Sequence, residues 1–377
     1  MTERVSAGIP LARQEVTEDD IAAVVGVLKS DRLSLGPKLA AFERAIADYV
    51  GVRHAVAVNS GTSALHLLVR GLGLKDGDEV ITTPFSFIAS TNCILFERAR
   101  AVFVDIDPVT LCIDPEQIVA AITPRTKAIL AVDVFGHPAD WAALERIADA
   151  HGLVLIEDSA EALGSEVKGR RCGSFGRAGI FGFYPNKQIT TGEGGVLVTN
   201  DEPLAQVCRS LADQGRGDGG WLSHVRMGYN FRLDEMSAAL GLSQFARIEQ
   251  IIADRARVAD WYLDGLRSVE GLVLPTVQPG VRMSWFVFVV RLSREFARSD
   301  RDRVLSELSR QGIGCRDYFQ PIHLQPYVRE LLGTNQGDLP VTEAVGDRSI
   351  SLPFYNRLRR EDVDRVVAAL ASAVRRR

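Results

Sequence analysis

Two patterns of apolar residues alternate along the chain between about residues 50 and 200. Short uninterrupted apolar runs are typical of buried strands, and stretches with an apolar residue at every third or fourth position are typical of amphipathic helices. Helices are expected at 64–72 and 141–151. Strands are expected at 55–58, 79–82, 101–104, 128–132, 153–157 and 196–199. This alternation predicts an α/β fold with a mainly parallel central sheet sandwiched by helices, whose functional groups gather at the carboxyl ends of the strands.

The segments outside this region predict two helices and a change of domain. Thr17 and Asp20 form a start like a capping box for a helix that runs towards Ser30. A long helical stretch follows Asp234, and the Gly/Pro-containing segment 271–280 then reads as a domain change.

The C-terminal third predicts a smaller α+β unit. A strand at 284–291, a helix at 302–311 and a terminal helix around 363–370 are expected there. We therefore predict a large domain of residues 1–255, whose N-terminal segment packs on the other domain, and a small C-terminal domain of residues 256–377.

The composition excludes several classes of function. The 377 residues carry a formal net charge of -4, which offers no basic face for nucleic acid. No segment approaches the ~20 apolar residues of a membrane span. The start of the sequence has no hydrophobic stretch typical of an export signal, so a cytoplasmic protein is expected. The five cysteines form no CxxC pair, which argues against a disulfide framework and a zinc site.

Lysine is scarce among the 44 cationic side chains. Only six of them are lysines, and none follows Lys187. A reaction that needs a side-chain amine as nucleophile therefore has six candidates. These are Lys29, Lys38, Lys75, Lys127, Lys168 and Lys187.

The first segment suited to chemistry is a strand that leads through small residues into a helix. Gly61, Thr62 and Ser63 stand where the helix begins, and free N–H groups with hydroxyls at such a place suit a phosphate. An ordinary helix cap has the same composition, so this segment alone leaves both readings open.

An acid and a lysine follow two later strands. Asp158 ends an apolar run, where a buried carboxylate needs a cationic partner to stay charged; a strand-end turn residue would form local hydrogen bonds instead. Lys187 lies between an apolar run and a Gly/Thr-rich turn, which permits the close approach of a ligand. Most other lysines lie among polar or turn residues, as solvated lysines do.

Two motifs that would indicate other chemistries lack the structural context that they require. GRGDGG (215–220) matches a dinucleotide-binding pattern but follows a helix-like segment, and Glu157 and Asp158, as neighbours on a strand, point to opposite faces. A phosphate cradle, a strand-end acid and an isolated lysine are what pyridoxal phosphate (PLP) requires. The lysine holds the aldehyde as a Schiff base, and the acid keeps the pyridine nitrogen protonated.

Seven sequence blocks closely resemble the DegT/DnrJ/EryC1/StrS family of sugar aminotransferases, which have the fold of type I PLP-dependent transferases. The blocks follow the family's order and cover nearly the whole chain. They are NSGTSAL (59–65), TTPFSFIAST (82–91), IEDSAEALGS (156–165), YPNKQITTGEGG (184–195), GYNFRLDEMSAALGL (228–242), FQPIHLQPY (319–327) and SLPFYNRL (351–358).

The resemblance implies a role for each residue that matches a family motif. Lys187 would be the Schiff-base lysine, and Asp158 would be the partner of the pyridine nitrogen. Phe87 would stack on the cofactor ring, and Gly61 and Thr62 would bind the phosphate.

One further match concerns the oligomer. Asn230 matches an asparagine that reaches the phosphate from the neighbouring subunit, which implies a homodimer with shared active sites. Two positions depart from the family. Gly182 stands where a serine commonly forms a hydrogen bond with the phosphate. Glu161 stands where a glutamine commonly lies near the phenolic oxygen of the cofactor. Neither departure removes the lysine or the strand-end acid.

The resemblance implies a ping-pong transamination. L-Glutamate would leave its amino group on the cofactor and a keto sugar would then receive it, with Lys187 moving the proton. TTGEGG (190–195) looks like the C4-aminating members, which favours a nucleotide-linked 4-keto-6-deoxy sugar; a 3-keto sugar nucleotide or a keto-cyclitol is the alternative. His323, Arg232 and Arg316 are candidates for substrate contacts.

Two other functions stay open on the same fold. An elimination would release ammonia and a deoxy sugar without 2-oxoglutarate. A PLP-binding sensor would bind the cofactor without turnover, although the complete pair of Lys187 and Asp158 argues against it.

Overall fold

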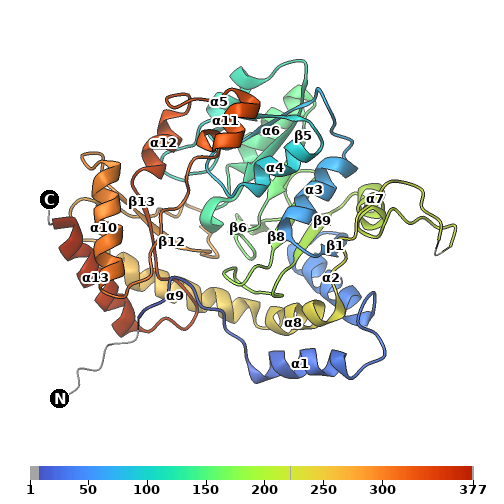
Figure 1. The fold of residues 1–377 in the computed structure, drawn as a ribbon, viewed down its shortest axis with the longest axis horizontal. Helices are drawn as coiled ribbons and strands as arrows, with labels where there is room; N and C mark the ends of the chain where they lie inside the picture. The colour runs from blue at the N-terminus through green and yellow to red at the C-terminus, as the bar shows by residue number, and fades with distance from the viewer. Residues whose placement is uncertain (1–7, 221, 376–377) are drawn as a thin grey trace.

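The structure, a computed structural model, describes residues 8–220 and 222–375. Its centre is a seven-stranded sheet of order β1-β9-β8-β5-β4-β2-β3, surrounded by helices (Figure 1). The strands are β1 (His54–Val58), β2 (Glu79–Thr82), β3 (Arg100–Phe103), β4 (Thr126–Val132), β5 (Val154–Asp158), β8 (Ala178–Gly182) and β9 (Gly195–Thr199). Neighbouring strands are parallel except at β9, which runs antiparallel to β1 and β8. The predicted mainly parallel sheet is confirmed.

Alternating side chains of the central strands enter two separate hydrophobic cores. On β9, Leu197 faces the core that contains α3 (Gly61–Gly71). Val196 faces a second core, which contains residues of α2 (Pro37–Val50) and α8 (Glu235–Phe245). Helices thus cover both faces of the sheet, which explains why its strands read as continuous apolar runs.

Strand β8 lies in the apolar run expected before Lys187, for which no strand bounds were predicted. Its sequence, AGIFG, contains two glycines, which weaken any strand pattern. The backbone requires one of them, because a Cβ on Gly179 would lie 2.9 Å from the Cα of Gly173.

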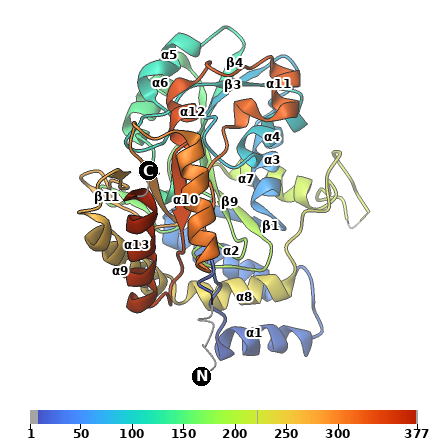
Figure 2. The same cartoon turned by 60° about the vertical axis from the view of Figure 1, so that its left-hand side comes forward.

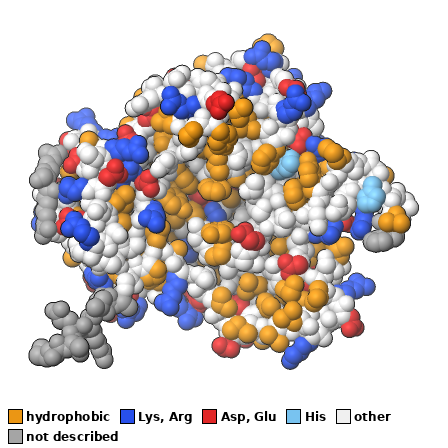
Figure 3. Space-filling view, in the orientation of Figure 1, with side chains coloured by type: hydrophobic (Ala, Val, Ile, Leu, Met, Phe, Trp, Pro, Cys, Tyr) orange, Lys and Arg blue, Asp and Glu red, His pale blue; other side chains and the backbone are white. Residues whose placement is uncertain are grey.

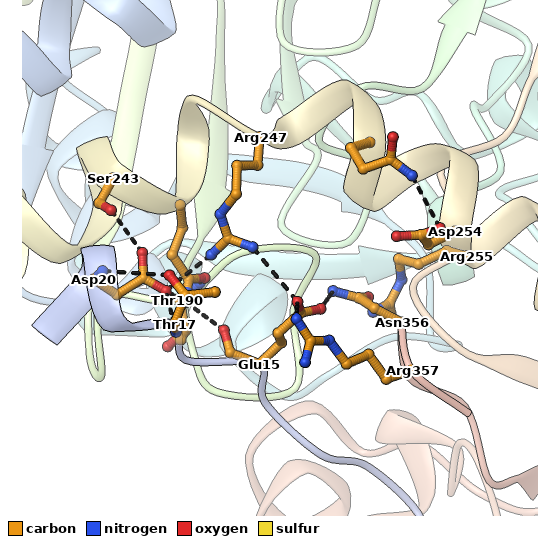
Figure 4. Close-up of polar contacts among 12 residues, drawn as sticks. Glu15, Thr17, Asp20, Thr190, Ser243, Arg247, Asp254, Arg255, Asn356 and Arg357 are labelled. Carbon is orange, nitrogen blue, oxygen red and sulfur yellow. Dashed lines mark hydrogen bonds and ion pairs between the residues drawn. The ribbon is translucent and has the colours of Figure 1, made fainter. Parts of the chain in front are cut away.

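The helical stretch after Asp234 consists of two helices, α8 and α9 (Ile248–Leu266), which meet at Arg247. There, Nη2 of Arg247 lies 2.8 Å from Oδ2 of Asp20, and Nη1 lies 3.7 Å from Oε1 of Glu15 (Figure 4). The break between the helices is therefore the place where the N-terminal segment is anchored.

Two of the remaining helices, α1 and α6, were predicted from the sequence and are confirmed. Helix α1 (Glu18–Leu28) begins with the capping box of Thr17 and Asp20. The others are α4 (Ala89–Phe96), α5 (Pro115–Ala121), α6 (Trp141–His151) and α7 (Glu202–Ala212). No helix in the described ranges is long and apolar enough to cross a membrane.

The second part of the chain surrounds a three-stranded antiparallel sheet of order β10-β12-β13. Its elements are β10 (Leu272–Val273), β12 (Phe288–Leu292), α10 (Arg298–Arg310), α11 (Pro326–Leu332), α12 (Pro340–Gly346), β13 (Ser349–Leu352) and α13 (Arg360–Arg375). Strand β12 begins later than predicted, because Trp285 has a φ of 56°, which strands do not adopt. A further small sheet joins β11 (Val281–Arg282), β6 (Glu166–Val167) and β7 (Arg170–Arg171).

The two parts of the chain are closely connected. Helices α10 and α13 lie side by side, and α13 packs on α9 (Figures 1 and 2). The N-terminal segment also contacts the second part, since the N–H of Ile9 donates to the oxygen of Gly312 at 2.8 Å. The boundary expected between residues 255 and 256 falls inside the continuous helix α9, and the division into two domains stays a prediction.

Candidate active site

A cavity of about 550 Å³ lies at the carboxyl-terminal edge of the central sheet. Strands β1, β5 and β8 all end there, because β1 and β8 both run antiparallel to β9, and β8 runs parallel to β5. Gly61 and Thr62 follow β1, Asp158 ends β5, and Lys187 lies in the loop after β8; all four line the cavity. The fold brings together the three segments that the sequence singled out.

The first turn of α3 forms one wall of the cavity. Ser60 caps the helix and accepts the N–H of Ser63 at 3.0 Å. The N–H groups of Gly61 and Thr62 belong to the first turn and have no partner within the helix. A Cβ on Gly61 would lie 3.4 Å from the Cα of Gly182, so the two backbones pass close together. Such a helix start, with its positive dipole end, suits a phosphate.

The loop that carries Lys187 is fixed on both sides of the residue. The N–H of Lys187 donates to the oxygen of Tyr184 at 2.9 Å. The side chain of Gln188 donates to the backbone oxygen of Glu161 at 2.6 Å and to Oγ of Ser284 at 2.9 Å. The lysine therefore emerges from a loop whose direction is set by neighbouring segments.

The same loop is attached to helix α8 and, through it, to the N-terminal segment. The side-chain oxygen of Gln244 accepts the N–H of Thr190 at 3.0 Å, and its nitrogen donates to the backbone oxygen of Glu15 at 2.8 Å. Thr190 lies beside this network in Figure 4. Nothing in the sequence pattern connects these segments, so only the folded chain reveals the support.

The amine of Lys187 lies between acidic groups and an aromatic ring, and 14% of its side chain is exposed. Its Nζ lies 3.6 Å from Oε1 of Glu161 and 3.9 Å from the centre of the Phe286 ring. Burial lowers the pKa of Lys187, and the charges of Glu161 and Asp158 oppose this effect. A lowered pKa increases the share of neutral amine, which is the form that attacks a carbonyl carbon.

Asp158 is buried at the end of β5 and accepts the N–H of Ala160 at 3.1 Å. Burial raises the pKa of Asp158 to about 7; the Ala160 hydrogen bond lowers it, while the charge of Glu161 raises it. A carboxyl group in this setting gains strongly from a cationic partner, such as the N–H of a protonated pyridine ring.

The two departures from the family pattern border the same cavity. Oε2 of Glu161 accepts the N–H of Phe135 at 2.8 Å, and burial raises the pKa of Glu161 against the opposing charge of Lys187. At Gly182, an added Cβ would meet nothing closer than the Cβ of Ala160 at 3.6 Å. A serine therefore fits at this position, and the glycine removes one hydroxyl group from the cavity wall.

Phe87 and Asn230 are both exposed, but they differ in their relation to the cavity. Phe87 lines it, with 62% of its surface exposed. Asn230 is not among the described residues that line it. The rings of Tyr229 and Phe231 stack on each other at 4.7 Å and contact His66 of the same chain. Because Asn230 lies between them in extended backbone, its side chain lies on the side of the segment opposite to the two rings.

The three residues considered for substrate contacts lie elsewhere. His323 is fully buried, and its Nε2 lies 3.0 Å from Oε1 of Glu343, so its ring packs in the core instead of facing the cavity. Arg232 forms an ion pair with Asp213 at 2.6 Å. Arg316 exchanges backbone hydrogen bonds with strand β13. None of the three is among the described residues that line the cavity of this chain.

An aromatic wall of the cavity was not expected from the sequence. Phe286, Tyr318 and Phe319 line it from the second part of the chain. The N–H of Phe286 donates to the oxygen of Phe135 at 3.2 Å, which holds this part against the sheet edge. In the sequence, Phe286 lies in an apolar run that reads as a strand. Phe319 begins a block that resembles the family, but its side chain was not assigned to the site.

The groups around the cavity fit PLP. The α3 start suits its phosphate, the buried strand-end acid suits its pyridine nitrogen, and the lysine amine suits its aldehyde. The open space at Gly182 leaves room beside the phosphate cradle.

Comparison with known proteins agrees with this geometry. The model of the DegT/DnrJ/EryC1/StrS aminotransferase family matches residues 14–371. The chain is 40% identical to GDP-perosamine synthase of Caulobacter vibrioides, over 89% of this chain and 90% of that protein. It is 38% identical to DesV of S. venezuelae, with a TM-score of 0.90 and 95% of both chains covered. It is 28% identical to the PLP-form of Spr1654 from Streptococcus pneumoniae, with a TM-score of 0.93, over 98% of this chain and 99% of that chain. The chain therefore belongs to the DegT/DnrJ/EryC1/StrS aminotransferase family and is a PLP-dependent sugar aminotransferase.

Proposed function

We propose that this enzyme transfers the amino group of L-glutamate to a nucleotide-linked 4-keto-6-deoxy sugar in a ping-pong reaction, with Lys187 and Asp158 as catalytic residues. The observation that carries the proposal is the position of Lys187. It is the one cation among the described residues of the cavity, and its amine lies 3.6 Å from Oε1 of Glu161. An amine of lowered pKa suits both a nucleophile and a proton carrier.

Five residues of the cavity have a task in this proposal. Gly61 and Thr62 bind the phosphate, Phe87 covers the ring, and Asp158 holds a proton on the pyridine nitrogen. When bound, PLP supplies an aldehyde that takes up the amino group and a ring that accepts electrons. The neutral amine of Lys187 takes the proton from the donor's α-carbon. In the second half of the cycle, Lys187 delivers a proton to the sugar carbon that receives the nitrogen.

The cavity of one chain carries too few cations for these ligands. Lys187 is opposed there by Asp158, Glu161 and Glu193. The phosphate and the two carboxylates of L-glutamate add further negative charge, which the helix start compensates only in part. We infer that a second copy supplies the missing positive and polar groups, so that the enzyme is a homodimer with shared active sites.

The surface around Asn230 supports this assembly. Asn230 is exposed on the side of its segment opposite to Tyr229 and Phe231, and Arg232 follows two positions later on the same side. The segment before Asn230 projects from the body of the molecule (Figure 1). Apolar side chains also gather on the face formed by α1 and the segment after it (Figure 3). Ile21, Val25 and Leu28 are exposed there, and a second copy would cover them.

The identity of the acceptor is proposed from two observations. The segment TTGEGG (190–195) borders the cavity through Glu193 and Gly194, and the chain is similar to GDP-perosamine synthase. A 3-keto sugar nucleotide or a keto-cyclitol enters the same experiment as a competing acceptor.

The experiment measures both halves of the reaction. L-Glutamate is expected to change the visible absorption of the PLP-loaded enzyme and to release 2-oxoglutarate, whereas Lys187→Ala gives neither signal. Lys75→Ala is the control, because Lys75 is exposed outside the cavity. The aminated product of each keto sugar is then identified by mass and NMR. An absorption that L-glutamate leaves unchanged would indicate a sensor, and ammonia without 2-oxoglutarate would indicate an elimination.

A further inference from the structure

Two further carboxyl groups, those of Asp133 and Glu157, lie behind Asp158. Glu157 and Ser159, its neighbours in sequence, are fully buried and do not line the described cavity. Asp133 follows the adjacent strand β4 and is also fully buried. Oγ of Ser159 lies 2.6 Å from Oδ2 of Asp133 and 2.8 Å from Oε1 of Glu157. One hydroxyl group therefore bridges two buried carboxyl groups.

The other hydrogen bonds of the two carboxyl groups come from N–H donors and, at Asp133, also from the thiol of Cys172. Oδ1 of Asp133 accepts the N–H of Ala139 at 2.9 Å and the indole N–H of Trp141 at 3.0 Å. Glu157 accepts two backbone N–H groups of the loop 173–175, at 2.5 and 2.8 Å. These donors occupy the carboxyl oxygens that would otherwise bind a metal ion. The arrangement is therefore a hydrogen-bonded network.

The hydroxyl group of Ser159 cannot donate a hydrogen bond to both carboxyl groups. A hydroxyl group has one proton to donate and otherwise accepts. Oγ of Ser159 is within hydrogen-bond distance of both carboxyl groups, so the two groups compete for one hydroxyl proton unless one of them is itself protonated. We propose that Asp133 and Glu157 share one proton through Ser159, which donates to Asp133 and accepts from Glu157, so that the pair carries a single negative charge at neutral pH.

The surroundings favour this single charge. Burial raises the pKa of both Asp133 and Glu157. In the described part of the chain, neither carboxyl group has a Lys, Arg or His among its main electrostatic partners. The thiols of Cys112 and Cys172 face them, with a pKa that burial raises, and Asp158 adds like charge. A second ionised carboxylate would thus be buried without a counter-charge.

The shared proton affects Asp158, and this step rests on the proposed function of that residue. The N–H of Asp133 donates to the backbone oxygen of Asp158 at 3.0 Å, and the N–H of Ser159 donates to the oxygen of Ile180 at 3.1 Å. The charge of Asp133 raises the pKa of Asp158, and an ionised Glu157 beside it would raise that pKa further. Asp133, Glu157 and Ser159 are therefore positioning residues, which hold the strand end and limit the charge behind it.

Infrared spectroscopy of the full-length chain without cofactor tests the shared proton. A protonated carboxyl group shows a carbonyl band that carboxylates lack, and we expect this band at pH 9. Asp133→Asn and Glu157→Gln should each abolish it, because the remaining carboxyl group ionises once its like-charged neighbour is gone. Asp158→Asn and Glu161→Gln should retain it.

Several outcomes would overturn the shared proton. They are a wild-type chain without the band at pH 9, a band that survives in either Asp133→Asn or Glu157→Gln, and a stoichiometric metal ion bound at Asp133, Glu157 and Cys172, whose ligand atoms lie within 4.8 Å of one another. The wild-type measurement stands even if a variant fails to fold, which circular dichroism would detect.

The pH titration of the visible absorption of the PLP-loaded enzyme tests the link to Asp158. Each single variant still has one charged carboxylate, so the titration should stay close to that of the wild type. The double variant Asp133→Asn/Glu157→Gln removes that charge and should shift the titration down by about one pH unit. An unshifted double variant would overturn the link. Failure of PLP to bind would instead contradict the proposed function and leave the infrared result standing.

Discussion

The amine nitrogen of Lys187 lies 3.6 Å from Oε1 of Glu161, whose other carboxyl oxygen accepts the N–H of Phe135 at 2.8 Å. The backbone hydrogen bond holds the carboxyl group in place, so the amine experiences its charge at a constant distance. A glutamine would keep the shape of this contact and remove the charge. The substitution Glu161→Gln therefore isolates the electrostatic effect of Glu161 on the lysine.

We predict that Glu161→Gln lowers the pKa of Lys187 further. Burial already lowers this pKa, and the charge of Glu161 is the largest influence that raises it. The pH above which the cofactor-free enzyme captures PLP rapidly should therefore fall by about one unit. The rate at which the visible absorption appears measures this at each pH. Glu193→Gln is the control, and an upward shift in Glu161→Gln would contradict the prediction.

We predict that Asp158→Asn stabilises the cofactor-free chain at high pH while it abolishes transamination. Burial raises the pKa of Asp158 from 3.8 to about 7. Between these values the folded chain keeps a proton that the unfolded chain has lost, so the contribution of Asp158 to stability is present below pH 4 and is lost as the pH rises through 7.

The two pKa values also set the size of the expected change in the free energy of unfolding. Removing the ionisable group should raise the free energy of unfolding by up to about 4 kcal/mol above pH 7 and change it little near pH 4. Urea unfolding followed by circular dichroism at both pH values measures the difference. Asp149→Asn, on the exposed side of α6, serves as the control. Equal stability of Asp158→Asn and the wild type at pH 8 would refute the prediction.

Gly182→Ser is predicted to strengthen the binding of PLP. A Cβ at this position meets the Cβ of Ala160 at 3.6 Å, an ordinary contact, so the serine fits without strain. One added hydrogen bond to a charged phosphate contributes about 1.5–3 kcal/mol, which corresponds to at least about tenfold tighter binding. Dissociation constants from absorption titrations measure this. Gly182→Ala separates the hydroxyl from the methylene, and equal affinity of the two variants would exclude the hydroxyl contact.

The ends of the strands explain why part of the site could be predicted from the sequence. Asp158 and Lys187 each follow an apolar run, and parallel strands bring such ends to one edge, so local pattern and topology point to the same place. The resemblance to the family added Phe87 and Asn230, which no periodicity marks. The apolar run of β8 was recognised before Lys187, but its two glycines left the bounds of the strand undefined.

The rest of the site depends on contacts between distant segments. Phe286 lines the cavity, and its N–H donates to the oxygen of Phe135, which lies about 150 residues earlier in the chain. Gln244 supports the lysine loop from α8, and no spacing in the sequence connects that helix with Thr190. His323 shows the converse, since a histidine beside a family motif turns out to pack against Glu343 in the core. Such pairings follow from packing, which the sequence pattern does not encode locally.

Mixed dimers provide the test of the shared active site. Lys187→Ala and Asn230→Ala are each expected to have little activity alone. If Asn230 acts across the interface, a hybrid of the two variants has one site with both native residues and one site with neither. Random mixing makes about half of the dimers hybrid, so about a quarter of the wild-type activity should return.

The same mixture also tests the alternative, in which Asn230 acts within its own chain. If Asn230 served the cavity of its own chain, every site in the hybrid would lack one residue and no activity would return. The exposure of Asn230 and the inward stacking of Tyr229 and Phe231 favour action across the interface. Lys187→Ala mixed with Lys75→Ala gives the matched control, because Lys75 lies outside the cavity and its chain contributes intact sites. Recovery with Asn230→Ala that depends on mixing, and is absent from either variant alone, would establish that each active site draws on both chains.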